Sequence, residues 1–274
     1  MKNKNIIGLL FTVALFLLGF SINGNVSLYF NISGLLVIFG GTLSATLISF
    51  RLEQLKIVAK VIQASYNSEI KKETEIVEIL IDLSIKSRIE GILSLQEKEN
   101  ETSILFLRRA LGCLVDGFHG SQIRDILNTE MYFFKLRRED LERIIRTIAD
   151  YFPSFGIIGS IIGLVSMLGG IGDTSVILKA VPVALTSTLY GIFFSNFFVL
   201  PFAANLRERT NHELLLQKII MEGVIAIDSE VNPVILKTKL ESFLTPSERM
   251  EELVSYRKIK ERFKIKEDGP RVHG

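Results

Sequence analysis

The chain has 274 residues, of which 48% are hydrophobic, with a formal net charge of +2 and one cysteine, Cys113. Its basic and acidic residues are interleaved, so the charge does not favour nucleic acid as a partner. A single cysteine excludes an internal disulfide, and the isolated His119, His212 and His273 have no second ligand at i+3 or i+4, which argues against a metal site.

Three long tracts contain no Asp, Glu, Lys or Arg: residues 5–50, 151–172 and 180–206. A helix of roughly 20 apolar residues crosses about 30 Å of hydrocarbon, where only its internal hydrogen bonds satisfy the backbone. The segment "SINGNVSLYFNIS" reads as a turn that divides the first tract. We therefore predict four transmembrane helices, at about 5–21, 32–50, 153–171 and 180–203, of which the last two form a helical hairpin.

The basic residues next to these spans predict the topology. Lys and Arg precede the first and third spans and follow the second and fourth, and such residues are enriched on the cytoplasmic side. Both termini are therefore expected in the cytoplasm. A secretory signal peptide cleaved after "GFS" is the alternative interpretation of the first span, and it would leave three spans.

The rest of the chain is expected to be helical, which gives an all-α fold class. Apolar residues recur at helical spacing within 51–150, with breaks near Asn67, Asn100 and Gly120, and no stretch alternates with period two. After the fourth span a helix continues to a break at Asn232 and Pro233. The expected domains are transmembrane helices 1 and 2 (1–50), a cytoplasmic helical domain (51–150), transmembrane helices 3 and 4 (151–203), and a cytoplasmic helical extension and tail (204–274).

Small residues form stripes on the last two spans. One stripe contains Gly156, Gly159, Gly163, Ser166 and Gly170, and the other contains Ser187, Gly191 and Ser195, with Thr186 and Thr188 beside it. Such faces let helices approach closely and hydrogen-bond through hydroxyls. Two interpretations remain open: ordinary helix packing, or a socket for a helix of another chain. That helix would bring the ionisable group that all four spans lack.

Prolines bracket this hairpin. By position alone Pro153 reads as the first residue of span three and Pro182 as part of the first turn of span four. Pro201 precedes sequence that still favours a helix, so a kink is expected there. No nucleophile has a base within reach by sequence and there is no phosphate loop, so an enzyme is not favoured.

The whole chain resembles the MotA family, the larger stator subunit of the bacterial flagellar motor, and more distantly the ExbB and TolQ proteins. The resemblance is carried by "ISGLLVIFGGTLSATLISFRLEQLK", "SRIEGILSLQ", "YFPSFGIIGSIIGLVSML" and "ALTSTLYGIFFSNFFVLPFAANL", in this order and spacing. It implies a multi-pass protein of the bacterial inner membrane, surrounded by lipid, that needs no cofactor and transports H⁺ or Na⁺. The alternative is an envelope energy-transducing or scaffold subunit of the ExbB/TolQ kind.

The resemblance also implies an assembly: a homo-oligomeric ring of five copies around a MotB-type partner, anchored to peptidoglycan, whose single span carries the ion-binding aspartate. The residues that would line the pore are Ser160, Gly163, Thr186, Ser187, Thr188 and Gly191, and Pro153 and Pro201 match the two functional prolines of the family. Ser160 and Thr188 match positions at which hydroxyls accompany sodium-driven members, although a hydroxyl also serves a proton-carrying water.

The cytoplasmic loop of the family engages the rotor protein FliG through charged residues. Arg88 matches the basic position, whereas the acidic position eight residues on is occupied by Gln96. Glu90, Glu97 or Glu99 is a possible substitute, and a solvated helical surface is the alternative interpretation for each of them.

Overall fold

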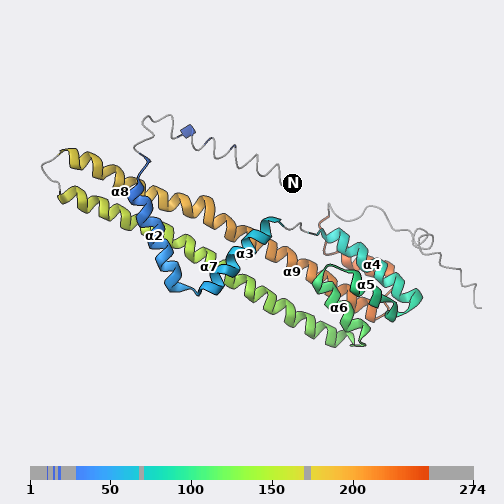
Figure 1. Cartoon of the computed structure of the whole chain (residues 1–274). Coiled ribbons are helices and arrows are strands. Elements are labelled where there is room, and N and C mark those ends of the chain that lie inside the picture. The colour runs from blue at the N-terminus through green and yellow to red at the C-terminus, as the bar shows by residue number, and fades with distance from the viewer. Residues whose placement is uncertain are drawn as a thin grey trace, which may run out of the picture. The chain divides into compact units, whose positions relative to one another are not determined.

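The computed structural model describes residues 29–67, 71–169 and 174–246, with isolated positions near the N-terminus, and every regular element in those ranges is helical. Figure 1 shows the helices in chain order. They are α2 (Ile32–Ser49), α3 (Leu52–Asn67), α4 (Glu73–Glu90), the 3₁₀ turn η2 (Ile92–Ser94), α5 (Leu95–Glu101), α6 (Leu105–Val115), α7 (Gly120–Gly169), α8 (Thr174–Phe194), the π-helix η3 (Ser195–Val199), α9 (Leu200–Asp228) and α10 (Pro233–Glu241).

Three described helical stretches are long and apolar enough to cross a membrane: Ile32–Ser49, part of Gly120–Gly169, and part of Ala180–Asp228. They coincide with the second, third and fourth predicted spans. The first predicted span, 5–21, lies outside the described ranges, as does the tail beyond residue 246. The all-α fold class is confirmed, and the number of transmembrane helices stays a prediction.

Two expectations about helix starts were wrong. Pro153 does not begin a helix, because α7 runs unbroken for 50 residues through it. Pro182 does not lie in a first turn, because α8 begins eight residues earlier, at Thr174. Proline inside a helix removes one backbone hydrogen bond. The chain can still remain helical there when the segments before and after the proline are packed against other helices.

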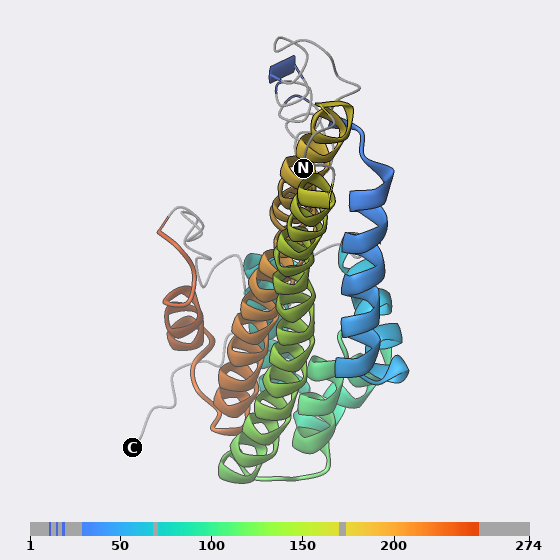
Figure 2. The same cartoon turned by 90° about the vertical axis from the view of Figure 1, so that its left-hand side faces the viewer.

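The chain forms two compact units. The first unit contains Met1–Tyr66 and Glu139–Arg207, and the second contains Asn67–Arg138 and Glu208–Gly274. In the first unit, α8 and the C-terminal half of α7 lie side by side in both Figure 1 and Figure 2, with α2 beside them. Three aromatic rings join these helices, because Phe39 of α2 contacts Phe152 of α7 and Phe194 of α8 at centroid distances of 5.6 and 4.8 Å.

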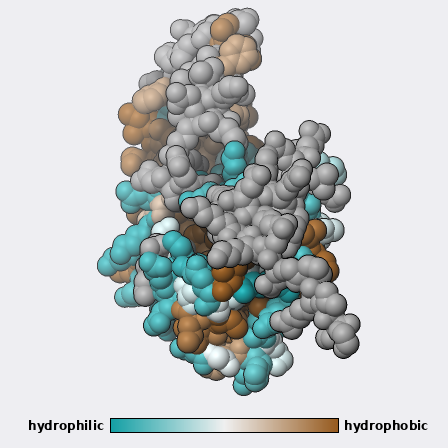
Figure 3. All heavy atoms as spheres, turned by 90° about the vertical axis from the view of Figure 1, so that its right-hand side faces the viewer, coloured by the Kyte–Doolittle hydropathy of each residue, from teal (hydrophilic) through white to brown (hydrophobic). Residues whose placement is uncertain are grey.

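The second unit has the larger hydrophobic core. Apolar side chains of α4, α6, the start of α7, α9 and α10 are buried there, including Leu80, Leu111, Leu127, Ile220 and Leu240. Hydrophilic residues cover much of this unit's surface in Figure 3, with small hydrophobic patches between them. A buried core under a charged surface is the pattern of a water-exposed domain.

A buried carboxylate links three helices of the second unit. Glu222 of α9, with its side chain 10% exposed, accepts hydrogen bonds from Arg124 of α7 at 2.8 Å and Lys239 of α10 at 2.7 Å. Burial raises the pKa of the Glu222 carboxyl, but the hydrogen bonds from Lys239 and Arg124 outweigh it and lower the pKa to about 2. The folded state therefore favours the ionised form.

We expect Glu222→Gln to lower the free energy of unfolding at pH 7 by about 3 kcal/mol, the equivalent of the pKa shift. Because the folded pKa is depressed, this stabilisation is complete above the ordinary pKa of 4.5 and disappears as the pH falls toward about 2. Urea denaturation followed by circular dichroism measures it. Glu213→Gln is the matched control, because Glu213 is 40% exposed and its ion pair with Arg138 is solvated. An equal decrease in the free energy of unfolding in Glu222→Gln and Glu213→Gln would contradict the prediction.

Candidate functional site

The glycine stripe of α7 packs against α8 of the same chain. A Cβ atom added at Gly163 would lie 2.8 Å from the backbone nitrogen of Ala184, and one added at Gly159 would lie 2.9 Å from Cβ of Ser187. On the opposite side, a Cβ at Gly191 would lie 2.5 Å from the carbonyl oxygen of Phe152. These glycines therefore allow α7 and α8 of the same chain to pack closely, as the packing interpretation predicts. We call this contact between the two helices the α7–α8 seam.

Ser160 and Thr188 lie together in the α7–α8 seam, and both are half-buried. The Ser160 hydroxyl donates to the carbonyl oxygen of Ala184, and the two hydroxyl oxygens are 2.5 Å apart. Since Ser160 has only one hydrogen to donate, Thr188 must donate to Ser160. The pair then presents only lone pairs to its surroundings, which suits a cation or a water molecule that donates.

Thr186 and Ser187 are buried more deeply and are engaged within the chain. Thr186 donates to the carbonyl oxygen of Pro182 at 2.7 Å, and Ser187 donates to that of Val183 at 2.8 Å. Their exposed fractions are 5% and 0%. Neither hydroxyl presents a free hydrogen, so their part in an ion path stays a prediction.

Asn31 and Tyr190 form a further link between the apolar helices, which no local pattern of the sequence predicts. The Asn31 side chain caps α2 by accepting from the backbone N–H of Gly34, and it donates to Thr186 at 3.2 Å. Its backbone N–H donates to the Tyr190 hydroxyl at 3.0 Å, and that hydroxyl donates to the carbonyl of Tyr29. Asn31 stands directly before an apolar run, a position that predicts a helix cap but not a link between helices.

Pro201 follows the π-helix η3. The backbone N–H of Leu200 donates to the carbonyl oxygen of Ser195, five residues earlier, so the helix is widened immediately before the proline. Proline lacks an N–H and clashes with the carbonyl four residues earlier, and a π turn relieves that clash. A local change of helix geometry is therefore present where a kink was expected.

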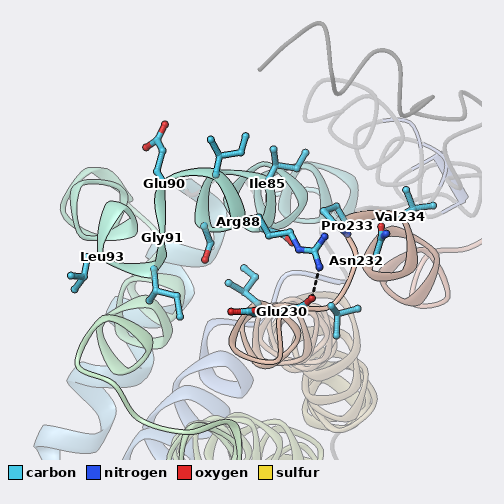
Figure 4. Close-up of a pocket in the computed structure, with 15 residues that line it drawn as sticks. Ile85, Arg88, Glu90, Gly91, Leu93, Glu230, Asn232, Pro233 and Val234 are labelled. Atoms are coloured by element: carbon cyan, nitrogen blue, oxygen red, sulfur yellow. Dashed lines mark hydrogen bonds between the residues drawn. The ribbon is translucent and has the colours of Figure 1, made fainter. Parts of the chain in front are cut away.

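The second candidate site is a groove on the second unit, shown in Figure 4. It has a volume of about 900 Å³ and lies between the C-terminal end of α4 and the chain that joins α9 to α10. Arg88 donates across it to the carbonyl oxygen of Glu230 at 2.8 Å. Glu230 has a φ of +50°, so Arg88 satisfies the carbonyl of a residue in the left-handed region. Arg88 thus has a structural role besides any role toward a partner.

The acidic candidates Glu90 and Glu97 share one cation. Nζ of Lys86 lies 3.9 Å from a carboxylate oxygen of Glu90 and 3.2 Å from one of Glu97. Glu90 lines the same groove as Arg88, whereas Glu97 lies on α5 and is 70% exposed. The three predicted rotor residues therefore lie around one end of α4, with both signs of charge at the surface.

Comparisons with known proteins agree with this architecture. Residues 98–218 match the model of the MotA/TolQ/ExbB proton channel family. The chain is 30% identical to motility protein A of Treponema phagedenis, over 92% of this chain and 97% of that protein. It is 27% identical to chemotaxis protein PomA of Vibrio alginolyticus, over 92% and 99% of the two chains. The flagellar MotAB stator complex of Bacillus subtilis has a similar fold, with a TM-score of 0.83 and 26% identity over 89% of this chain and 96% of that one.

Proposed function

This chain belongs to the motility protein A family, and we propose from that membership that it is a stator subunit of a bacterial flagellar motor. It would work with a MotB-type partner to convert an ion-motive force into torque on the rotor. The proposal is supported by similarity over nearly the whole chain and by a fold that matches a MotAB stator complex.

One observation carries the proposal. The apolar stretches 32–49, 151–169 and 180–203 contain no Asp, Glu, Lys or Arg, and the last two present hydroxyls in the α7–α8 seam. An ion that crosses hydrocarbon needs a charged or strongly polar partner there. A second chain must therefore supply the carboxylate, which is the role we assign to the MotB-type partner. Five copies of this chain would surround that partner in the inner membrane, each with four spans and cytoplasmic termini.

In the proposed cycle, an ion from outside neutralises the partner's carboxylate. This lowers the free-energy cost of placing that carboxyl group against an apolar surface of the ring. Release of the ion inward restores the charge, so each transfer changes which face of the ring is favoured. One elementary charge moved through 100 mV supplies about 2.3 kcal/mol, several times the thermal energy. We assign Ser160 and Thr188 to the ion route, and Pro153 and Pro201 to the transmission of movement along α7 and α9.

The direct test is motility in a strain whose only stator contains this chain and its partner. External sodium is replaced by potassium at constant pH, and the stall force of tethered cells is measured. Torque that follows sodium would identify a sodium-driven stator. Torque that ignores sodium but disappears with a protonophore would identify a proton-driven one. No torque in either medium would contradict the stator proposal and favour an envelope energy-transducing subunit.

Contact with the rotor protein FliG is assigned to the end of α4. We expect Arg88→Gln to reduce torque because it removes the charge, and to lower the melting temperature slightly, because glutamine ends two bonds short of the guanidinium nitrogens and loses the exposed bond to the Glu230 carbonyl. Arg88→Ala should reduce torque and also cost about 1 kcal/mol of stability through the lost hydrogen bond. Tethered-cell torque and thermal denaturation separate the two effects. Full torque in Arg88→Gln would exclude a role for this charge at the rotor.

A further inference from the structure

The helix that follows the first described membrane stretch is amphipathic and redirects the chain. Helix α2 ends at Ser49, Phe50 is extended with φ −133° and ψ 146°, and α3 begins at Leu52. The Gln54 side chain accepts from the backbone N–H of Arg51 at 3.2 Å, which fixes the start of α3. Figure 1 shows α3 leaving α2 at a turn instead of extending it.

The inner face of α3 is covered by its own unit. Val58 is 6% exposed and packs with Ile144 and Ile145 of α7 and with Ala203 and Leu206 of α9. Leu55, Val61 and Ile62 of α3 lie against the same cluster. This contact holds α3 in place and determines which of its faces points outward.

The outer face of α3 is basic and partly apolar. Leu52, Lys56 and Lys60 follow one another at four-residue spacing, so they form one row along the helix. Both lysines are exposed, Leu52 is 59% exposed and Ile57 is 49% exposed. The only acidic residue of α3, Glu53, lies on the same face in the first turn, three residues before Lys56.

Among the described residues, Arg51 just before α3 and the lysines of its outer face have no partner in an ion pair. Within the described part of the first unit, Arg143 and Arg146 form ion pairs with carboxylates of their own helix, at 2.8 Å in each case. Arg51, Lys56 and Lys60 form none among the described residues. Cations that form no ion pair with the described residues, beside exposed apolar side chains and immediately after a membrane-length helix, have the chemistry of a lipid-headgroup interface.

We propose that the outer face of α3 binds anionic phospholipid headgroups in the leaflet where α2 ends. Arg51, Lys56 and Lys60 would contact the phosphates, while Leu52 and Ile57 enter the interfacial layer. The inference requires only that α2 crosses a membrane. A chain that proved unable to drive rotation would still show this binding, so the two proposals fail separately.

The test uses the full-length chain with its MotB-type partner in lipid nanodiscs. An environment-sensitive dye is attached to Gln63→Cys in a Cys113→Ser background, because Gln63 is exposed three residues after Lys60 on the same face. We expect the emission to move to shorter wavelength when phosphatidylcholine is replaced by an equal mixture with phosphatidylglycerol. High salt should reverse the shift, since it screens contacts between exposed charges. Equal emission in the two lipid compositions would overturn the proposal.

The variant Arg51→Gln/Lys56→Gln/Lys60→Gln should lose the response, because each basic residue near an anionic surface strengthens binding by about fivefold. The matched control, Lys71→Gln/Lys72→Gln/Arg137→Gln, removes three exposed cations of the second unit and should keep it. A response that persists in the first variant, or that resists salt, would mean that apolar insertion acts alone and would overturn the proposal. If the first variant does not assemble, the single variant Lys60→Gln and the salt series on the parent protein test the proposal instead. Lys60→Gln should weaken the emission shift, and salt should reverse it in the parent protein.

Discussion

We expect Gly191→Ala to destabilise the first unit by about 2–3 kcal/mol, although alanine ordinarily favours a helix. The added Cβ would lie 2.5 Å from the carbonyl oxygen of Phe152 and 3.1 Å from Cα atoms of Pro153 and Gly156. All three are backbone atoms, which cannot move aside as a flexible side chain can. The only relief is separation of α7 from α8, which removes the contacts of the α7–α8 seam along its length.

The measurement is the melting temperature of the purified protein in detergent, which should fall by roughly 5–10 °C for this loss of stability. Gly40→Ala on α2 is the matched control, since a Cβ there meets no atom within 4 Å. The control should be neutral or slightly stabilising, because glycine is about 1 kcal/mol less favourable than alanine inside a helix. If Gly191→Ala melted with the control, the two helices would not be in the close contact described above.

The membrane-length helices could be predicted from sequence because their signal is local. An uncharged tract of fixed length predicts α2 over 32–50, and the structure has Ile32–Ser49. Asn232 followed by Pro233 predicts a break with a new helix start, and Asn232 does cap α10 by accepting from the backbone N–H of Val234. Each of these signals acts within a few residues of the feature it predicts.

Features that depend on tertiary packing could not be predicted in this way. A proline favours the start of a helix, yet Pro153 lies inside α7, where the seam with α8 and the cluster containing Ile144 hold both sides of it. The small-residue stripes predicted a close helix contact but not which helix would make it. The link from Asn31 to Tyr190 joins positions 159 residues apart, which no local pattern reports.

The candidate rotor site likewise combines a feature that the sequence predicts with features that only the fold shows. Resemblance pointed to Arg88 through its neighbours in "SRIEGILSLQ". Arg88 donates a hydrogen bond to the Glu230 carbonyl, which belongs to a turn 142 residues further along the chain. The structural role of Arg88 is therefore visible only in the fold. The contact of Glu97 with Lys86 likewise depends on the turn at Gly91, whose φ is +84°, whereas Glu90 reaches Lys86 through the local i,i+4 spacing of α4.

The hydroxyl pair of the α7–α8 seam gives the second large effect. We expect Thr188→Val to slow ion transfer through the motor at least about tenfold, equivalent to about 1.4 kcal/mol in the barrier, and so to lower the torque while the ring still assembles. Valine matches threonine in shape but has no lone pair to offer an ion or a water. Ser160 keeps its bond to the Ala184 carbonyl in this variant, so no buried donor loses its acceptor. Ser160→Ala should behave similarly, because Thr188 can turn to the carbonyl of Ala184, four residues earlier on its own helix.

Torque of tethered cells and size-exclusion chromatography of the complex together distinguish an ion-route role from a packing role. Ser166→Ala is the matched control, since Ser166 is exposed on α7 and its hydroxyl donates only to the Ile162 carbonyl of its own helix, at 2.9 Å. Low torque with intact assembly in Thr188→Val, and normal torque in the control, would assign the pair to the ion route. Normal torque in both would show that the pair only joins two helices, and the ion would then have to pass along another face of α7 or α8. Loss of assembly in Thr188→Val would contradict the prediction directly, because it would mean that one hydroxyl holds together a seam already closed by glycine contacts.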